Sequence, residues 1–531
     1  MNGDKSKISV IKLCLLIFFI IVVIIPISKM IMHLRDVDVI AIIGSPQFLI
    51  ALAHSLEVSI VSTIISLILA LLLAIFINRT KIKFKSFICG VLTLPMLIPS
   101  ISHGMGIILL FGENGIFKAF TGISFSIYGY WGVIMGSVMY SFPVAFLMIT
   151  DVIKYEDYTP YEVGEILGLR FMGKFRVIML PYLKKPLITI FFAVFTLIIT
   201  DYGIPLMVGG MFITLPVLMY EEVIGLLNFG KGCVYGIVLL VPAIIAFLVD
   251  IKNSNVSKVN VAQPFRIKEN KARDYIAQIF CLCILILIIL PLASFSCLAF
   301  IKNFPYDLDI SIDNILKTFS MGGAIYLTNS IIIATITSVL GTAIAFVTSY
   351  LTSRIPSKSS KLLHVISITT LAIPGIVLGL SYVICFNKSY IYGTIIILIL
   401  VNMVHFFASP YLMMYNTLGK LNENLESVGM LLGLNRIEII WDIIIPQTKE
   451  TLYEMFLYFF VNSMMTISAV SFLGTVNTKP IALMITQFEA QMMLECAAFV
   501  SITILCVNLI MKSTIFIIRE KIINTEKNNA Y

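Results

Sequence analysis

The sequence predicts an all-α transmembrane protein of about 12 membrane-spanning helices, arranged as two parallel repeats. Hydrophobic residues make up 59% of its 531 residues and charged residues 12%, whereas charged residues form about a quarter of an ordinary soluble protein. Apolar runs recur along the chain, and two long polar loops share one spacing of glycine and proline. This composition excludes a soluble globular protein and a disordered chain. The nine cysteines are scattered, mostly within apolar runs, which excludes a secreted disulfide scaffold.

Each predicted span is an apolar run close to the length of about 20 residues that a helix needs to cross the hydrocarbon core. A transmembrane β-barrel would need alternating segments of about ten residues, and the sequence has no such pattern. The predicted spans are residues 11–32, 51–77, 87–111, 129–150, 186–208, 229–250, 276–300, 323–350, 362–386, 391–415, 450–472 and 491–512.

The positive charges predict the orientation of these spans. If the N-terminus is cytoplasmic, 29 of the 37 Lys and Arg residues fall in segments on the inside and 8 on the outside. Such an excess marks the cytoplasmic side of a membrane protein. We therefore expect a multi-pass protein of the bacterial cell membrane with both termini in the cytoplasm. The net charge of +8 is spread over these short segments, so no nucleic-acid partner is predicted.

An internal repeat organises the chain into two halves. Residues 161–181 and 426–446 lie 265 positions apart and share seven residues, including both glycines of a Gly-x-x-x-Gly step and the final proline. A second correspondence, offset by 275, matches Ser55 with Ser330, Arg79 with Arg354, Pro99 with Pro374 and Gly104 with Gly379. We predict a first half over 1–250, a polar linker over 251–275 and a second half over 276–531. Six spans in each half give both halves the same orientation.

The repeated segments lie in two long loops, residues 151–185 and 416–449. Each is expected to form a short helix, a turn at the glycine and a second short helix that ends near Pro181 or Pro446. Glycines four residues apart lie on one helical face and would allow another backbone to approach closely. Such a helix pair would either dock a soluble partner or anchor the loop at the membrane surface. The residues alone leave both alternatives open.

The loops resemble the EAA loop of ABC importer permeases, whose pattern is Glu-Ala-Ala, three residues, Gly, nine residues, then Ile-x-Leu-Pro. In register with this pattern, the first copy has Glu162, Val163, Gly164, Gly168, Ile178, Leu180 and Pro181. The second copy has Ser427, Val428, Gly429, Gly433, Ile443, Ile445 and Pro446 at the same positions. Both alanines are replaced in both copies, and in the second copy Glu426 stands one residue before the register of the glutamate. The pairs His54–Ser55 and Asn329–Ser330, with Pro99 and Pro374, extend the resemblance over nearly the whole chain.

This resemblance implies the fold of a type I ABC importer permease with two coupling helices and alternating access. The implied partners are two ATP-binding subunits, an extracytoplasmic solute-binding protein and the lipid bilayer. The residues implied in coupling to the ATPase are Glu162, Gly164, Gly168, Pro181, Glu426, Gly429, Gly433 and Pro446. A phosphate-loop match at 225–232 ends in Gly232, where Ser or Thr would bind magnesium. We therefore expect a permease subunit without cofactor, metal site or catalytic residues, with ATP hydrolysis in separate subunits.

The segment 200–210 resembles its counterpart in permeases for 2-aminoethylphosphonate, which makes that solute the predicted substrate. Asp201 would either meet an ammonium group or cap a helix end, and Pro205 would break the helix and free backbone groups. Ferric iron is the main alternative substrate, and thiamine or a polyamine is a further one. The resemblance implies these alternatives because a fused two-copy permease is typical of systems for ferric iron, thiamine and phosphonates. An ion-coupled secondary transporter is the alternative mechanism, although the sequence has few charges within its spans. Candidate pathway residues are Asp201, Tyr202, Pro205, Asn402 and Asn462.

Overall fold

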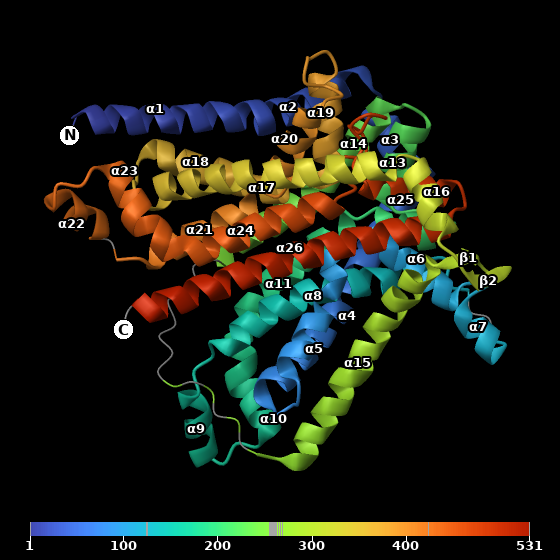
Figure 1. Ribbon diagram of the computed structural model, residues 1–531, viewed down its shortest axis with the longest axis horizontal. Coiled ribbons are helices and arrows are strands. Elements are labelled where there is room, and N and C mark those ends of the chain that lie inside the picture. The colour runs from blue at the N-terminus through green and yellow to red at the C-terminus, as the bar shows by residue number, and fades with distance from the viewer. Residues whose placement is uncertain are drawn as a thin grey trace.

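The computed structural model describes residues 2–123, 126–253, 263, 265, 267, 269–422 and 424–529. The predicted linker 251–275 falls largely outside these residues, since 254–262, 264, 266 and 268 are not among them. Long helices run side by side through the molecule, and short helices cover their ends (Figure 1). The prediction of an all-α transmembrane protein is confirmed, with one small hairpin of two strands.

In its described residues, the first half of the chain contains fourteen α-helices and five short helical turns of other types. They are α1 (Asn2–Phe19), η1 (Ile20–Ile24), α2 (Ile25–Met32), η2 (His33–Asp36), α3 (Val39–Ile43), α4 (Pro46–Arg79), α5 (Lys85–Leu92), η3 (Leu94–Leu97), α6 (Ser100–Phe111), α7 (Ile116–Thr121), α8 (Tyr130–Lys154), α9 (Thr159–Ile166), α10 (Phe171–Lys174), η4 (Phe175–Met179), α11 (Leu180–Ile199), α12 (Gly203–Val208), α13 (Leu215–Tyr220), η5 (Glu221–Gly225) and α14 (Phe229–Asn253).

The second half repeats this order, with the strand hairpin inserted after its first helix. Its elements are α15 (Lys271–Leu298), β1 (Ile301–Asn303), β2 (Asp307–Ile310), α16 (Asp313–Ser320), α17 (Gly323–Ser353), α18 (Lys358–Thr369), η6 (Thr370–Ala372), α19 (Gly375–Phe386), α20 (Ile395–His405), α21 (Ala408–Lys420), α22 (Leu425–Leu431), α23 (Arg436–Ile439), η7 (Ile440–Ile444), α24 (Ile445–Met465), α25 (Ala482–Ala490) and α26 (Leu494–Asn529). β1 and β2 are antiparallel and pair Ile301 with Ile310.

Eight helical segments are long and apolar enough to cross a membrane, and two bent pairs raise this number to ten. These segments are Ile8–Asp36, Pro46–Arg79, Tyr130–Lys154, Met172–Ile199, Phe229–Val249, Lys271–Leu298, Gly323–Ser353 and Leu494–Lys521. The bent pairs are α18 with α19, at 109°, and α20 with α21, at 50°. By length and apolar character, the structure therefore has eight to ten spans in its described part, fewer than the predicted 12.

Two predicted spans account for this difference. The span predicted over 87–111 is divided into α5, η3 and α6. Pro95 and Pro99 lie at the two breaks, and proline has no N–H to continue a helix. The span predicted over 450–472 lies mostly in α24, which ends at Met465. The N-terminal half of α24 carries Lys449, Glu450 and Glu454, so it is too charged to count as apolar.

The two halves share one packing plan. In the first half α4 packs against α8 and α11, and in the second half α17 packs against α21 and α24. The first helices are exchanged between the halves: α1 and α2 pack against α18 and α19, whereas α15 packs against α5 and α6. Tyr382 donates a hydrogen bond to the carbonyl of Val22 at 2.8 Å, and Lys12 donates one to the carbonyl of Ile355 at 2.8 Å.

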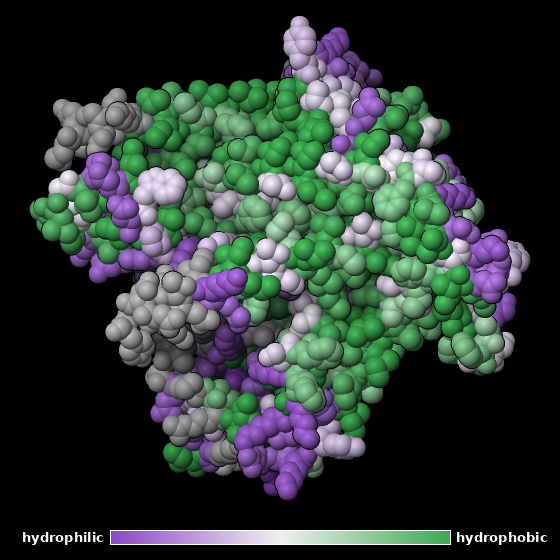
Figure 2. Space-filling view, in the orientation of Figure 1, coloured by the Kyte–Doolittle hydropathy of each residue, from purple (hydrophilic) through white to green (hydrophobic). Residues whose placement is uncertain are grey.

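Apolar side chains cover the middle of the molecule, and hydrophilic side chains gather at its two ends and lower edge (Figure 2). Exposed residues of the long helices, such as Ile64 and Ile68 of α4 and Ile286 and Leu287 of α15, are large and aliphatic. A soluble protein rarely exposes apolar surface of this extent. This apolar belt is the surface that lipid chains would cover.

Candidate functional site: the two repeated loops and the segment between the halves

The Gly-x-x-x-Gly-Leu sequence of the first loop ends a helix. Gly168 has a φ of +72°, a left-handed conformation that glycine adopts without strain. The N–H of Gly168 donates to the carbonyl of Glu165 at 3.0 Å, and the N–H of Leu169 donates to that of Gly164 at 2.8 Å. These two bonds form a Schellman motif at the C-terminus of α9.

The second loop forms the same motif at the C-terminus of α22. Gly433 has a φ of +86° and donates to the carbonyl of Met430 at 3.1 Å. Leu434 donates to the carbonyl of Gly429 at 3.1 Å. The repeated spacing therefore encodes the end of a short helix in both halves.

Within the chain, side chains of the same loop approach the first glycine of each pair. A Cβ on Gly164 would meet the side chain of Ile178 at 3.1 Å, and one on Gly429 would meet the side chain of Ile439 at 2.8 Å. Both neighbours belong to the same loop as the glycine. The first glycine of each pair thus allows the loop to fold back on itself, because the second half of the loop packs over α9 or α22.

The prolines do not end the second helix of each loop, which corrects a further prediction. Pro181 and Pro446 stand at the beginning of α11 and α24, and each follows a π-helical turn, η4 or η7. The N–H of Leu180 bonds to the carbonyl of Phe175, five residues earlier, just before Pro181. Because the π-helical turn shifts the hydrogen-bonding pattern there, the helix continues through the proline.

An arginine at the end of α4 holds the first loop. The Arg79 guanidinium forms an ion pair with the buried carboxylate of Glu156 and donates to the carbonyl of Ile153 at 3.2 Å. Tyr161 of α9 donates to the same carboxylate at 2.6 Å. Phe265 covers the cluster, with its ring 3.3 Å from Arg79 Cζ. Arg79 therefore pairs with Glu156 rather than with Glu162, the residue in register with the EAA glutamate.

Arg354 holds the second loop in the same way from the end of α17. Its Nε and Nη2 donate to the two carboxylate oxygens of Glu426 at 2.7 and 2.5 Å, a bidentate pair. It also donates to the carbonyls of Leu421 and Asn422, at 3.2 and 2.7 Å. Glu426 thus forms the ion pair of this loop although it precedes the register of the EAA pattern.

Each short helix ends in an exposed apolar tip. Ile166 ends α9 and Leu167 follows it, with 86% and 71% of their surface exposed. In the second loop Leu431 ends α22 and Leu432 follows it, at 87% and 75%. Both helices lie in the left half of Figure 1, the side on which both chain ends lie. Exposed apolar groups on an ordered helix are typical of a docking surface.

The predicted pathway residues around the fifth span lie at and within the start of α12. Asp201 is half-buried, and its carboxylate accepts hydrogen bonds from the Ser100 hydroxyl at 2.6 Å and the Ile204 N–H at 3.0 Å. The second of these bonds caps α12, which contains Pro205. The Tyr202 hydroxyl bonds to that of Ser471 in the other half at 2.6 Å.

The two asparagines are placed differently. Asn462 donates to the carbonyl of Tyr458 in its own helix at 2.7 Å. Asn402 of α20 is fully buried, and neither atom of its amide has a hydrogen-bond partner among the described residues. The structure therefore joins Asp201, Tyr202 and Pro205 in one segment and gives the two asparagines separate surroundings.

Two serines have a role that sequence reasoning did not identify. Ser55 accepts a hydrogen bond from the N–H of Leu215 at 2.7 Å, and Ser330 accepts one from the N–H of Ile481 at 2.8 Å. Leu215 begins α13, and Ile481 precedes α25, so each serine holds the start of a short helix in its half. The signal was present, because Ser55 and Ser330 match at offset 275, but their partners are distant in sequence.

Comparisons with known proteins agree with the duplication. The family described as binding-protein-dependent transport system inner membrane component matches residues 62–252 and again residues 339–523. The ferric transport system permease protein FbpB of Actinobacillus pleuropneumoniae is 25% identical over 507 residues, which cover 90% of this chain and 73% of that protein. The putative ferric transport system permease protein FbpB 1 of Haemophilus influenzae is 25% identical over 404 residues, or 73% of this chain and 64% of that protein.

A shorter match is the molybdenum transport system permease protein ModB of Azotobacter vinelandii, 24% identical over 165 residues. It covers 30% of this chain and 73% of ModB, so it corresponds to a single copy of the repeat. With two matched copies and the same arginine-held loop in each half, this chain belongs to the family of binding-protein-dependent transport system inner membrane components.

Proposed function

We propose that this chain is the membrane-spanning subunit of an ABC importer that carries ferric iron delivered by an extracytoplasmic binding protein. Two ATP-binding subunits dock on the loops 151–185 and 416–449 and supply the energy by hydrolysing ATP. The repeated loop carries the proposal: each half presents a short helix with an exposed apolar tip, held by an arginine at the end of a long helix.

The proposal places both termini and both loops in the cytoplasm. It assigns residues 1–250 and 276–531 to the two halves and 251–275 to the linker between them. The excess of Lys and Arg in the corresponding segments supports this orientation, as does the position of α9 and α22 on the side of the chain ends (Figure 1).

The arrangement suggests how movement of a docked ATP-binding subunit reaches the membrane. Arg79 and Arg354 form polar links between each loop and the long helices α4 and α17. Charge-assisted hydrogen bonds are short and directional, so a shift of α9 or α22 would pull the end of its long helix. Closure of the two ATP-binding subunits would thus draw α4 and α17 together at the cytoplasmic side.

Ferric iron is preferred to 2-aminoethylphosphonate for two reasons. The two relatives that cover most of this chain are named as ferric transport permeases. In addition, the carboxylate of Asp201 already accepts hydrogen bonds from Ser100 and Ile204, so the protein itself satisfies part of its acceptor capacity in this conformation. Uptake of 2-aminoethylphosphonate stays a prediction that the same experiment tests.

Uptake by cells with and without this gene is the test. Radiolabelled ferric citrate, 2-aminoethylphosphonate, thiamine and putrescine would be supplied separately, each with and without depletion of ATP. Loss of ATP-dependent iron uptake alone is the expected result. Loss of ATP-dependent uptake of another of these solutes would support the assignment as an importer and would change the proposed substrate to that solute. Uptake that persists without ATP but collapses with the ion gradient would overturn the importer.

A further inference from the structure

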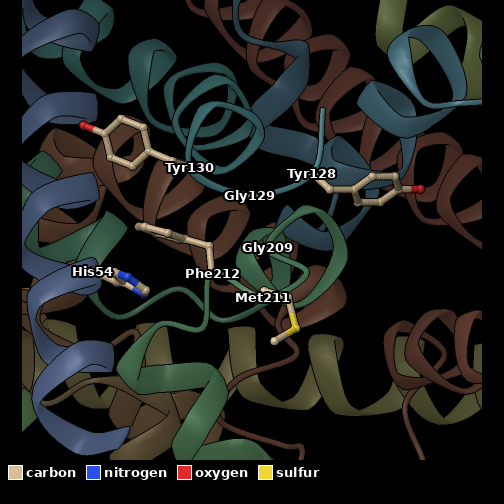
Figure 3. A pocket seen from close by; sticks show the side chains of 7 residues that line it. All are labelled: His54, Tyr128, Gly129, Tyr130, Gly209, Met211 and Phe212. Carbon is tan, nitrogen blue, oxygen red and sulfur yellow. The ribbon is translucent and has the colours of Figure 1, made fainter. Parts of the chain in front are cut away.

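An open pocket of about 440 Å³ lies away from the loops 151–185 and 416–449 and borders the end of the segment 200–210. It is formed where α4 and α8 begin and by the segment that follows α12 (Figure 3). The residues that line it are His54, Tyr128, Gly129, Tyr130, Gly209, Met211 and Phe212. Its volume is in the range of small-molecule sites, about 300–1,000 Å³.

Aromatic rings form most of the pocket wall. Phe212 stacks on the imidazole of His54 at 3.8 Å, and its centroid lies 5.5 Å from that of Tyr130 in an edge-to-face arrangement. His54 Nδ1 lies 3.0 Å from the carbonyl of Ile213, and the N–H of Gly129 donates to the carbonyl of Val208 at 2.7 Å. The rings are therefore held in place by backbone contacts on either side of the pocket.

Two carboxylates lie near the tyrosines of the pocket. The carboxylate of Glu57 lies one turn beyond His54 on α4 and interacts electrostatically with the hydroxyl of Tyr130. Burial and the carboxylate of Glu113 raise the pKa of Tyr128. None of the seven lining residues is Lys or Arg. Negative charge together with the negative faces of aromatic rings attracts a cation and repels an anion.

The second half offers an informative comparison. Asn329, one residue before Ser330 as His54 is before Ser55, donates to the carbonyl of Lys479 at 3.4 Å. The ammonium of Lys479 lies over the ring of Tyr326, 5.8 Å from its centroid. Near the corresponding place in the second half, an ammonium group of the chain itself therefore lies over an aromatic ring. The pocket of the first half is open instead.

The pocket lies at one surface of the apolar belt. His54 is about 38 Å from Arg79 along α4 at the helical rise of 1.5 Å per residue, so the pocket is at the end opposite the first loop. Beside it, 71% of the surface of Trp131 and 44% of that of Tyr128 are exposed. Tyr and Trp gather at the level of the lipid headgroups.

We propose that this pocket binds an ammonium group on a short chain, held against the rings of Tyr130 and Phe212 with Glu57 as its counter-ion. A phosphatidylethanolamine headgroup and a free amine share this chemistry. The position at the surface of the apolar belt favours the lipid.

The test measures binding to the purified full chain, so it does not depend on transport. The chain in detergent would be exchanged with equal amounts of phosphatidylethanolamine and phosphatidylglycerol of identical acyl chains, and retained lipid would be counted by native mass spectrometry. A second arm would measure the thermal shift caused by choline or ethanolamine without added lipid. The variants are Glu57→Gln, which removes the charge, and Phe212→Leu, which removes a ring. Asp309→Asn, an exposed carboxylate of β2, is the matched control.

We expect the wild type and the control to retain phosphatidylethanolamine preferentially, and each pocket variant to lose this preference about tenfold, as expected for about 1.4 kcal/mol. No lipid preference, but an amine-induced shift that Glu57→Gln abolishes, would support the same site with a soluble ligand. Equal retention of both lipids together with no amine-induced shift would overturn the proposal. Wild-type binding by both pocket variants would overturn it as well.

Discussion

Two arginines connect the loops to the long helices, and their surroundings make them hard to replace. The side chains of Arg354 and Glu426 are 6% and 12% exposed. Removing one partner of a buried ion pair leaves an uncompensated charge and costs about 3–5 kcal/mol. Loss of either partner should therefore destabilise the loop by more than the Coulomb energy of the pair in water.

We expect Arg354→Ala to lower both thermal stability and solute uptake, the latter at least about tenfold, because Glu426 would remain buried without its partner. The double variant Arg354→Ala/Glu426→Ala should recover stability but not uptake, since α22 would still be detached from α17. Purified protein would be compared in thermal melts and cells in uptake. Arg519→Ala is the control, because its pair with Glu450 is exposed and should contribute less than about 1 kcal/mol. Full uptake by Arg354→Ala would contradict the role of this pair.

The loops themselves are built around glycines with left-handed backbones. Gly168 and Gly433 have open space where a Cβ would stand, so only their backbone conformation resists substitution. Glycine is therefore required at these two positions for its backbone conformation and not for its small size.

Gly168→Ala and Gly433→Ala should each cost about 1–2 kcal/mol of loop stability through the positive φ, with partial loss of uptake. Gly168→Asp and Gly433→Asp should abolish uptake while the protein still inserts, because they add a charge beside an apolar docking tip. Gly419→Ala in α21 is the matched control, since its Cβ also meets open space but its backbone is helical. Normal uptake by both aspartate variants would show that these loops do not dock the ATP-binding subunits.

The two loops differ in what covers their arginine. Phe265, which follows the first half, packs on Arg79 and lies 4.9 and 5.2 Å from the rings of Tyr158 and Tyr161. Arg354 is instead surrounded by backbone carbonyls of its own half.

We therefore expect Phe265→Ala to speed hydrogen exchange in α9 and leave α22 unchanged, so that the second loop is an internal control. Equal protection of α9 in both proteins would contradict this assignment.

At the level of the whole molecule, the exchanged first helices make each half depend on the other. Without the first half, the carbonyl of Ile355 loses Lys12 and α19 loses its packing against α2. Without the second half, α6 loses its packing against α15. These faces are apolar, so each half alone would expose surface that the intact chain buries.

Separate expression of residues 1–262 and 263–531 should therefore fail to accumulate either half, whereas co-expression should restore both and part of the uptake. Immunoblots of membrane fractions, with the intact chain as reference, would measure accumulation. Stable accumulation of one half on its own would show that the exchanged helices contribute little to stability.

Composition and spacing were sufficient for the class of the protein, its duplication and the family resemblance. Hydropathy reports apolar length directly, and the repeated Gly-x-x-x-Gly and proline spacing is a local signal, since the Schellman motif closes within six residues. The same local view did not register where apolar runs are broken, because hydropathy does not report the breaks at Pro95 and Pro99 or the bend between α18 and α19.

Packing in three dimensions decided which residues become partners, and no spacing along the chain contains this information. The partner of Arg79 is Glu156 rather than Glu162, and Ser55 and Ser330 hold backbone 160 and 151 residues away. The exchange of α1 and α15 between the halves is of the same kind. Each of these contacts joins residues that are distant in sequence, and their choice depends on which side chains share a buried space after the helices have packed.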